Sequence, residues 1–185
     1  MNLRIFIAAA ALALHGCASA PPHSPSMGPG LVPVEAAGDY MHPPSGLVFP
    51  AQIEQYRRAS LFRGSANTQH LTVGYAGGTP ECLAAITMFI DPASGTIEEA
   101  YARANAEVRE AFDTAVLERE ATHPRLVSRF AEYLVDDRRL QLVVEAVKPG
   151  WVLKYRVIFP ATCVETPLYV GGFFNQFSGL NKLGQ

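Results

Sequence analysis

Two basic residues on one predicted strand are the first candidates for chemistry in this chain of 185 residues. In the run GWVLKYRVIF, Lys154 and Arg156 fall on the same face, because successive side chains of a strand point to opposite sides of the sheet. Two neighbouring cations, with Glu145 opposite, could bind an anion. Cross-strand pairs of unlike charge also stabilise a sheet without any ligand, so both interpretations stay open and the second is the simpler.

The histidines give weaker evidence for a functional site. His70 and His123 stand alone in the sequence, and each could be a general base or an ordinary surface imidazole. The chain contains no G-x-S-x-G, no H-E-x-x-H and no phosphate-binding G-x-x-x-x-G-K-[ST] motif. We therefore assign no catalytic, cofactor-binding or metal-binding residue, and we expect no cofactor.

The amino-terminal segment has the anatomy of an export signal. Arg4 precedes about ten apolar residues, a run too short for a membrane-spanning helix, which needs roughly 20. The motif that follows, Leu14-His15-Gly16-Cys17, resembles the lipobox of bacterial lipoprotein precursors. The resemblance implies that residues 1–16 are a signal peptide, that Cys17 carries acyl chains such as palmitate, and that the membrane is a partner through this anchor.

Two alternatives remain for this end of the chain. The small residues Ala18, Ser19 and Ala20 would suit ordinary signal peptidase and release a soluble periplasmic product, although the fixed φ of Pro21 fits a protease cleft badly. An uncleaved amino-terminal anchor is the other alternative. In the lipoprotein interpretation, the resemblance also implies that Ala18, which is not Asp, directs the protein to the outer membrane, with its domain facing the periplasm.

Two further cysteines, Cys82 and Cys163, remain once Cys17 is assigned to lipid. An even pair in a chain bound for an oxidising compartment predicts a Cys82–Cys163 disulfide. Closing so long a loop would stabilise the fold by about 4 kcal/mol. A reactive thiol pair or a metal site is the alternative, but neither cysteine has a histidine at ligand spacing.

Composition divides the chain after its signal. Residues 17–46 are dense in Pro, Gly, Ser and Ala, and predict a lipidated end followed by a partly extended linker. His23 and His42 fall within it, where a flexible segment would not preorganise a metal site. Residues 47–185 are short enough, and the chain at 49 % hydrophobic residues apolar enough, for a single globular domain. A net charge of −2 does not provide the positive surface that nucleic-acid binding requires, so we do not expect nucleic acid as a partner.

The strongest local pattern predicts one long helix from about Thr96 to Glu120. Thr96 with Glu99 three residues later forms a capping box, and an apolar stripe at helical spacing follows. The side chains expected to be buried are Tyr101, Val108 and Phe112.

Alternating patterns predict strands on both sides of this helix. HLTVGYAGG and ECLAAITMFI precede it and meet at a glycine-rich turn, whereas three later runs are joined by turns at Asp136-Asp137 and Pro149-Gly150. A second helix is predicted from Thr166 onward. The fold class is therefore α+β, a mostly antiparallel sheet with one long helix and a C-terminal helix packed on one face.

Two functional hypotheses follow from the anchor and the missing motifs. The first is a non-enzymatic envelope lipoprotein, a protein-binding or structural module whose partner is another envelope protein. The second is a periplasmic small-molecule-binding protein or enzyme, with aromatic side chains around a pocket instead of in the core. The aromatic residues in question are Tyr75, Trp151, Tyr155, Phe173 and Phe177. A filled core with an exposed apolar patch would favour the first hypothesis, and a deep pocket the second.

Overall fold

The computed structural model of the chain describes residues 30–123, 128–163 and 166–183. The predicted signal peptide, Cys17 and His23 lie outside the described residues, as does the side chain of His123. The elements are β1 (Leu31–Pro33), β2 (Tyr40–His42), β3 (Leu47–Phe49), β4 (Gln52–Ile53), β5 (Tyr56–Gly64), β6 (Leu71–Thr79), β7 (Cys82–Pro92), α1 (Ile97–Ala111), β8 (Val116–His123), β9 (Ser128–Val135), β10 (Arg138–Lys148), β11 (Trp151–Pro160) and α2 (Thr166–Asn181).

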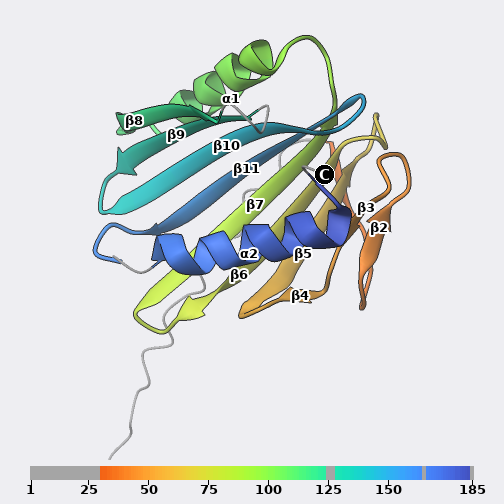
Figure 1. Ribbon diagram of the computed structural model, residues 1–185, viewed down its shortest axis with the longest axis horizontal. Coiled ribbons are helices and arrows are strands. Elements are labelled where there is room, and N and C mark those ends of the chain that lie inside the picture. The colour runs from red at the N-terminus through yellow and green to blue at the C-terminus, as the bar shows by residue number, and fades with distance from the viewer. Residues whose placement is uncertain (1–29, 124–127, 164–165, 184–185) are drawn as a thin grey trace, which may run out of the picture.

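One antiparallel sheet of nine strands organises the fold (Figure 1). Its order is β1-β5-β6-β7-β11-β10-β9-β8, with β4 beside β5, while β2 and β3 form a separate pair. Helix α1 carries the chain from β7 to the far edge at β8, and the meander β8 to β11 then returns to pair with β7. The α+β class, and the turns predicted at Asp136-Asp137 and Pro149-Gly150, are as expected from the sequence.

The two helices lie on opposite faces of this sheet, whereas the sequence analysis predicted one face. On β11, Val152 and Ile158 pack with the apolar cluster under α1, while the alternate residues Leu153 and Val157 belong to the cluster under α2. Alternate side chains of a strand point to opposite faces. Because both faces of β11 carry apolar residues, the strand needs cover on both sides.

The first helix is shorter than predicted. Its N-cap is Thr96 with the expected capping box to Glu99, but the helix ends at Ala111, and β8 replaces its last predicted turns. Tyr101 and Val108 are buried as expected, whereas Phe112 is only half-buried. Pairing of β8 with β9 outweighs the local helical preference of this segment.

The folded domain also starts before residue 47. Strand β1 pairs with β5, and β2 pairs with β3, so the part of the predicted linker from Leu31 onward is built into the domain. His42, expected in a linker, is 1 % exposed, and its Nδ1 shares a 2.8 Å hydrogen bond with the Ser45 hydroxyl.

The turn between β6 and β7 is not the glycine-rich segment that the sequence predicted. Gly77 and Gly78 lie within β6, and the turn follows at residues 80–81.

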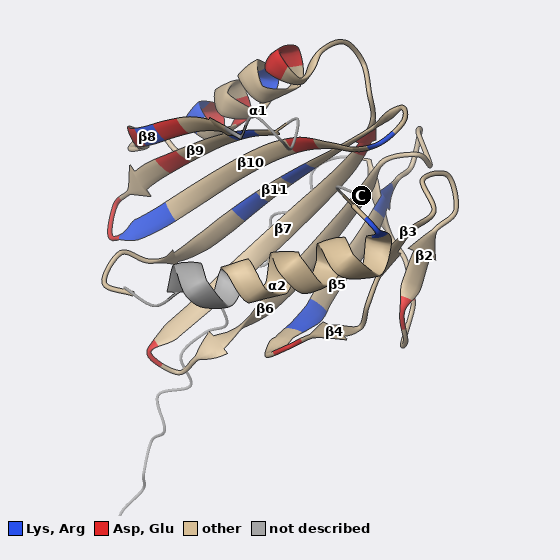
Figure 2. Cartoon of the chain, in the orientation of Figure 1, with Lys and Arg blue, Asp and Glu red and all other residues tan. Residues whose placement is uncertain are grey.

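The proposed aromatic pocket is instead part of the core. Tyr75, Tyr155, Phe173 and Phe177 are at most 7 % exposed, and Trp151 packs against the same cluster. Helix α2, which supplies the two phenylalanines, carries no charged residue along its length, in contrast to α1 (Figure 2). Among its described side chains Phe173 and Phe177 are buried and Leu180 is exposed, so the helix covers the sheet with one face.

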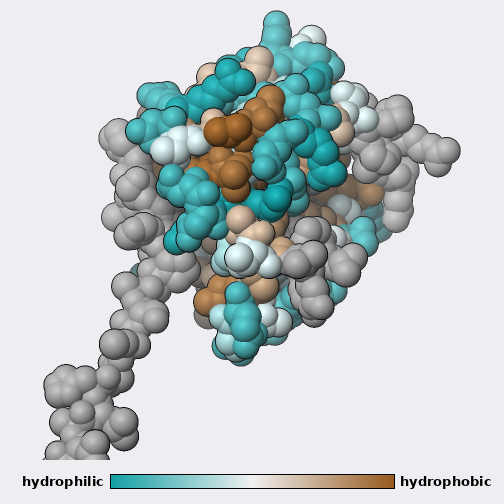
Figure 3. Space-filling model, turned by 90° about the vertical axis from the view of Figure 1, so that its left-hand side faces the viewer, coloured by the Kyte–Doolittle hydropathy of each residue, from teal (hydrophilic) through white to brown (hydrophobic). Residues whose placement is uncertain are grey.

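An apolar patch is exposed at the end of the sheet that holds the β9–β10 turn (Figure 3). A hollow of ≈ 280 Å³ there is lined by Phe112, Val135, Leu140 and Ile158, with charged residues of the turn beside it. The neighbouring Val116, at the start of β8, is 61 % exposed.

Candidate functional site

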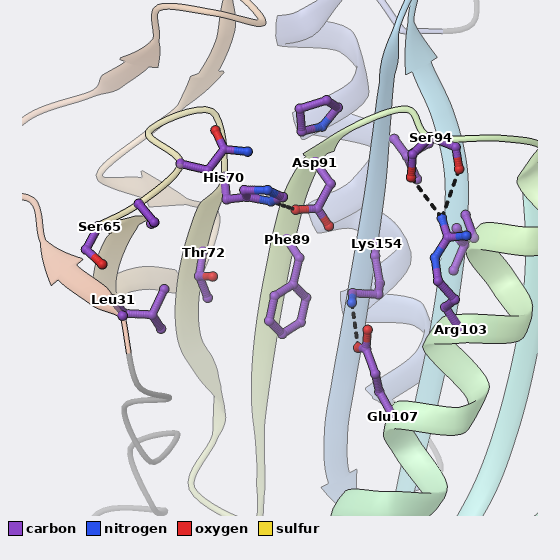
Figure 4. Close-up of a pocket in the computed structure, with 18 residues that line it drawn as sticks. Leu31, Ser65, His70, Thr72, Phe89, Asp91, Ser94, Arg103, Glu107 and Lys154 are labelled. Atoms are coloured by element: carbon purple, nitrogen blue, oxygen red, sulfur yellow. Dashed lines mark hydrogen bonds and ion pairs between the residues drawn. The ribbon is translucent and has the colours of Figure 1, made fainter.

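A groove of ≈ 600 Å³ lies between α1, the β5–β6 loop and the sheet, and we name it the α1 groove. Its apolar lining includes Leu31, Phe89, Val144 and Val152. Figure 4 shows Phe89 in the middle of it, with polar side chains on both sides. The groove therefore combines an apolar floor with walls that carry many polar and charged side chains.

Lys154 lines one wall of the groove and Arg156 lies beside it, and both pair with Glu107 of α1. Lys154 Nζ donates to Glu107 Oε2 at 2.6 Å, and Arg156 Nη2 donates to the same oxygen at 2.8 Å. Both cations also lie over the ring of Phe89, which stands opposite Lys154 in the β7–β11 register. The side chains of Lys154 and Arg156 are only 13 % and 15 % exposed.

Glu145, suggested as the partner of these cations, points to the other face of the sheet. Its register partner on β11 is Leu153, which belongs to the α2 cluster, and not Lys154 or Arg156. Burial raises the pKa of Glu145 to about 7, and its charge adds to the burial that raises the pKa of Tyr155. The simple cross-strand interpretation of Lys154 and Arg156 is therefore wrong.

His70 is not isolated in the structure, since its Nδ1 bonds to Asp91 Oδ1 at the opposite wall of the groove (Figure 4). The β6–β7 register places Leu71 opposite Ile90, so the next position outward brings His70 beside Asp91. The alignment of these two strands in a hairpin could have predicted from the sequence that His70 lies beside Asp91. Glu107 had no such signal, because its position depends on how α1 packs on the sheet.

A histidine oriented by a carboxylate can act as a general base. Among the described residues, however, no serine, threonine or cysteine is hydrogen-bonded to His70. His70 and Asp91 have side chains 46 % and 38 % exposed, so water reaches the pair freely. The buried His42 is no substitute, because burial lowers its pKa and Trp151 packs edge-on against its ring.

The wall on the α1 side has one more cation, Arg103. Its Nη2 donates to the backbone oxygen of Ser94 at 3.1 Å, which ties the first turns of the helix to the loop after β7 (Figure 4). Within the described ranges, no group of three or more His, Cys, Asp or Glu side chains is arranged to hold a metal ion. The groove's polar groups instead make hydrogen bonds and ion pairs with one another and with the backbone.

Away from the groove, Cys82 and Cys163 are joined across the start of β7 and the end of β11. Their Cα atoms are 5.6 Å apart, inside the range that a disulfide requires.

Comparison of the chain with models of known protein families, with curated proteins and with solved structures finds no match. Neither of the two helices in the described part of the chain has both the length and the apolar character needed to cross a membrane.

Proposed function

We propose that this protein is a lipid-anchored binding protein of the bacterial cell envelope, without enzymatic activity, whose α1 groove holds a small molecule. The observation that carries the proposal is the groove itself. Its volume of ≈ 600 Å³ lies within the range of about 300–1,000 Å³ that is typical of small-molecule sites. An apolar floor is usual in such sites, and polar groups on the walls would fix the orientation of a ligand.

The location is supported by two features of the chain. The motif Leu14-His15-Gly16-Cys17 resembles a lipobox, which would anchor the protein through acyl chains at Cys17. The Cys82–Cys163 pair suits an oxidising compartment such as the periplasm. With Ala18 after the anchor, we place the protein on the outer membrane with its domain facing the periplasm.

A protein partner is the second candidate, and it is favoured by the filled aromatic core, by the exposed apolar patch beside the β9–β10 turn and by edge strand β8. In the described sheet β8 pairs only with β9, so its outer edge presents unpaired backbone groups beside the exposed Val116 and Leu117. Another envelope protein could add a strand there. The charged residues Glu118, Arg119 and Glu120 on the same strand oppose this, because charges are a common protection of sheet edges.

The test is mass spectrometry of small molecules that stay bound when the protein is purified from envelopes. Ala100 lines the groove, whereas Ala102 is exposed on the same helix, so Ala100→Trp and Ala102→Trp make a matched pair. We expect wild type and Ala102→Trp to retain the same compound, and Ala100→Trp to lose it. If Ala100→Trp lowers the melting temperature, Thr72→Trp, which fills the groove from β6, replaces it in this test. Retention of the compound by the groove-filled variants would contradict the proposal.

A further inference from the structure

Lys154 of the α1 groove and its neighbour Arg156 are more buried than a pair of surface sheet residues would be. Their side chains are 13 % and 15 % exposed, whereas Glu107, their common partner, is 48 % exposed. Placing charged groups away from water is unfavourable unless each is well paired. The arrangement of Lys154 and Arg156 therefore calls for an explanation beyond sheet stability.

The pairing of these cations is incomplete. Lys154 and Arg156 share one carboxylate oxygen, Glu107 Oε2, so two positive charges face one negative charge. Arg156 Nε is buried and has no hydrogen-bond partner among the described residues. The ring of Phe89, 4.7 Å from Lys154 Nζ, supports the cations through its π face but supplies no charge.

The other charged groups of the groove do not complete the pairing. Asp91 is bonded to His70 at the opposite wall, and Arg103 adds a further positive charge on α1. The lining itself is balanced, with Glu107 and Asp91 as its acidic side chains and Lys154 and Arg103 as its basic ones. Arg156, which lies beside the groove and shares Glu107 with Lys154, adds the positive charge that no lining carboxylate offsets.

We propose that Lys154 and Arg156 anchor an anionic group of the groove's occupant, and that Glu107 is an internal stand-in which this group displaces. Glu107 extends from the solvent-exposed side of α1, so its carboxylate can turn into water when an anion arrives. Lysine and arginine both bind carboxylate and phosphate, and arginine does so with two parallel hydrogen bonds.

The occupant is therefore an amphiphilic anion, a carboxylate or phosphate on an apolar body. The anionic group would lie at Lys154 and Arg156, and the apolar body would lie along the groove floor formed by Phe89, Val152 and Leu31. This inference rests on the proposed function, because it names the ligand class of the same groove.

Titration calorimetry of the purified full chain at low salt tests whether Lys154 and Arg156 bind an anionic group. The probes are 4-phenylbutyrate, phenyl phosphate and the neutral 4-phenylbutanamide, which shares the apolar body of the first. Dihexanoylphosphatidylglycerol is a further probe, and a preference for it over the other anions assigns the anion to a lipid headgroup instead of a free organic acid.

We expect the anions to bind wild type at least about tenfold more tightly than the amide, since hydrogen bonds to charged groups are worth at least this factor. Lys154→Gln should remove most of that difference and leave amide binding unchanged, and Lys154→Arg should restore it. Glu107→Gln should tighten anion binding several-fold. Glu110→Gln removes an exposed carboxylate from the same helix and changes the net charge equally, and it should leave anion affinity unchanged.

Equal affinity for the anions and the amide in wild type would contradict the role of Lys154 and Arg156 as an anion site, while leaving the groove as a binding site. Absence of binding for every probe at millimolar concentration would also overturn it. Anion binding that is unchanged in Ala100→Trp would instead place the site outside the groove, and would contradict the proposed function itself.

Discussion

Glu145 is the acidic residue whose ionisation fits its surroundings least. It lies on the α2 face between β9 and β11, opposite Ser128 and Leu153, and burial raises its pKa from an ordinary 4.5 to about 7. In the unfolded chain the same carboxyl ionises near its ordinary value. Between these two pKa values the folded protein binds more protons than the unfolded one, so the free energy of unfolding falls as pH rises through this window.

Glu145→Gln should therefore stabilise the protein at pH 8 and change little at pH 4, where both states of the wild type hold the proton. The gain at pH 8 should approach, at most, about 3 kcal/mol for a shift of this size. Urea unfolding at both pH values measures it, with the exposed Glu110→Gln as control. An equal effect at both pH values would show that packing, and not ionisation, governs this site.

The two cysteines of the domain give a second residue-scale prediction. Protein isolated without reductant should have no alkylatable thiol at Cys82 or Cys163, because the two are joined in the fold. Cys82→Ser with Cys163→Ser should lower the free energy of unfolding by about 2–5 kcal/mol. Peptide mass spectrometry after alkylation checks the first result, and ready labelling of both thiols in folded protein would contradict it.

At the scale of elements, local patterns predicted what depends on neighbours in sequence. The capping box at Thr96 and the hairpin turn at Asp136-Asp137 depend on adjacent residues, and both occur as predicted. The end of α1 and the existence of β8 depend on pairing with β9, which no local pattern contains. The meeting of Glu107 with Lys154 depends on helix packing, so this part of the candidate site could not be predicted.

The packing of α1 on the sheet can be tested on its buried face. Val108 is 0 % exposed beneath the helix, so Val108→Asp should destabilise the fold by several kcal/mol, roughly 3–5, through an unpaired buried charge. Ala106→Asp, on the exposed face of the same helix, should change the melting temperature little. Similar melting temperatures for the two variants would mean that the helix face has been assigned wrongly.

At the scale of the whole molecule, the proposed anchor would keep the groove near a membrane. Gly30 and Leu31, the first residues that the structure describes, line the α1 groove. Residues 18–29, even if fully extended at about 3.6 Å each, would reach at most about 43 Å. A linker running to residue 46 would have allowed a much longer reach, so with the proposed anchor the early start of the domain would bring the groove closer to membrane-derived molecules.

The proposal that the protein works at a bacterial membrane rests on Cys17, and one measurement tests it most directly. Envelope fractionation of wild type and Cys17→Ala should be combined with mass spectrometry of the mature amino terminus. We predict a membrane-bound wild type that begins at Cys17 and carries acyl chains, because several acyl chains are needed for stable anchoring. The Cys17→Ala variant should be unprocessed and carry none. A soluble wild-type product that begins at Pro21 would contradict the proposal.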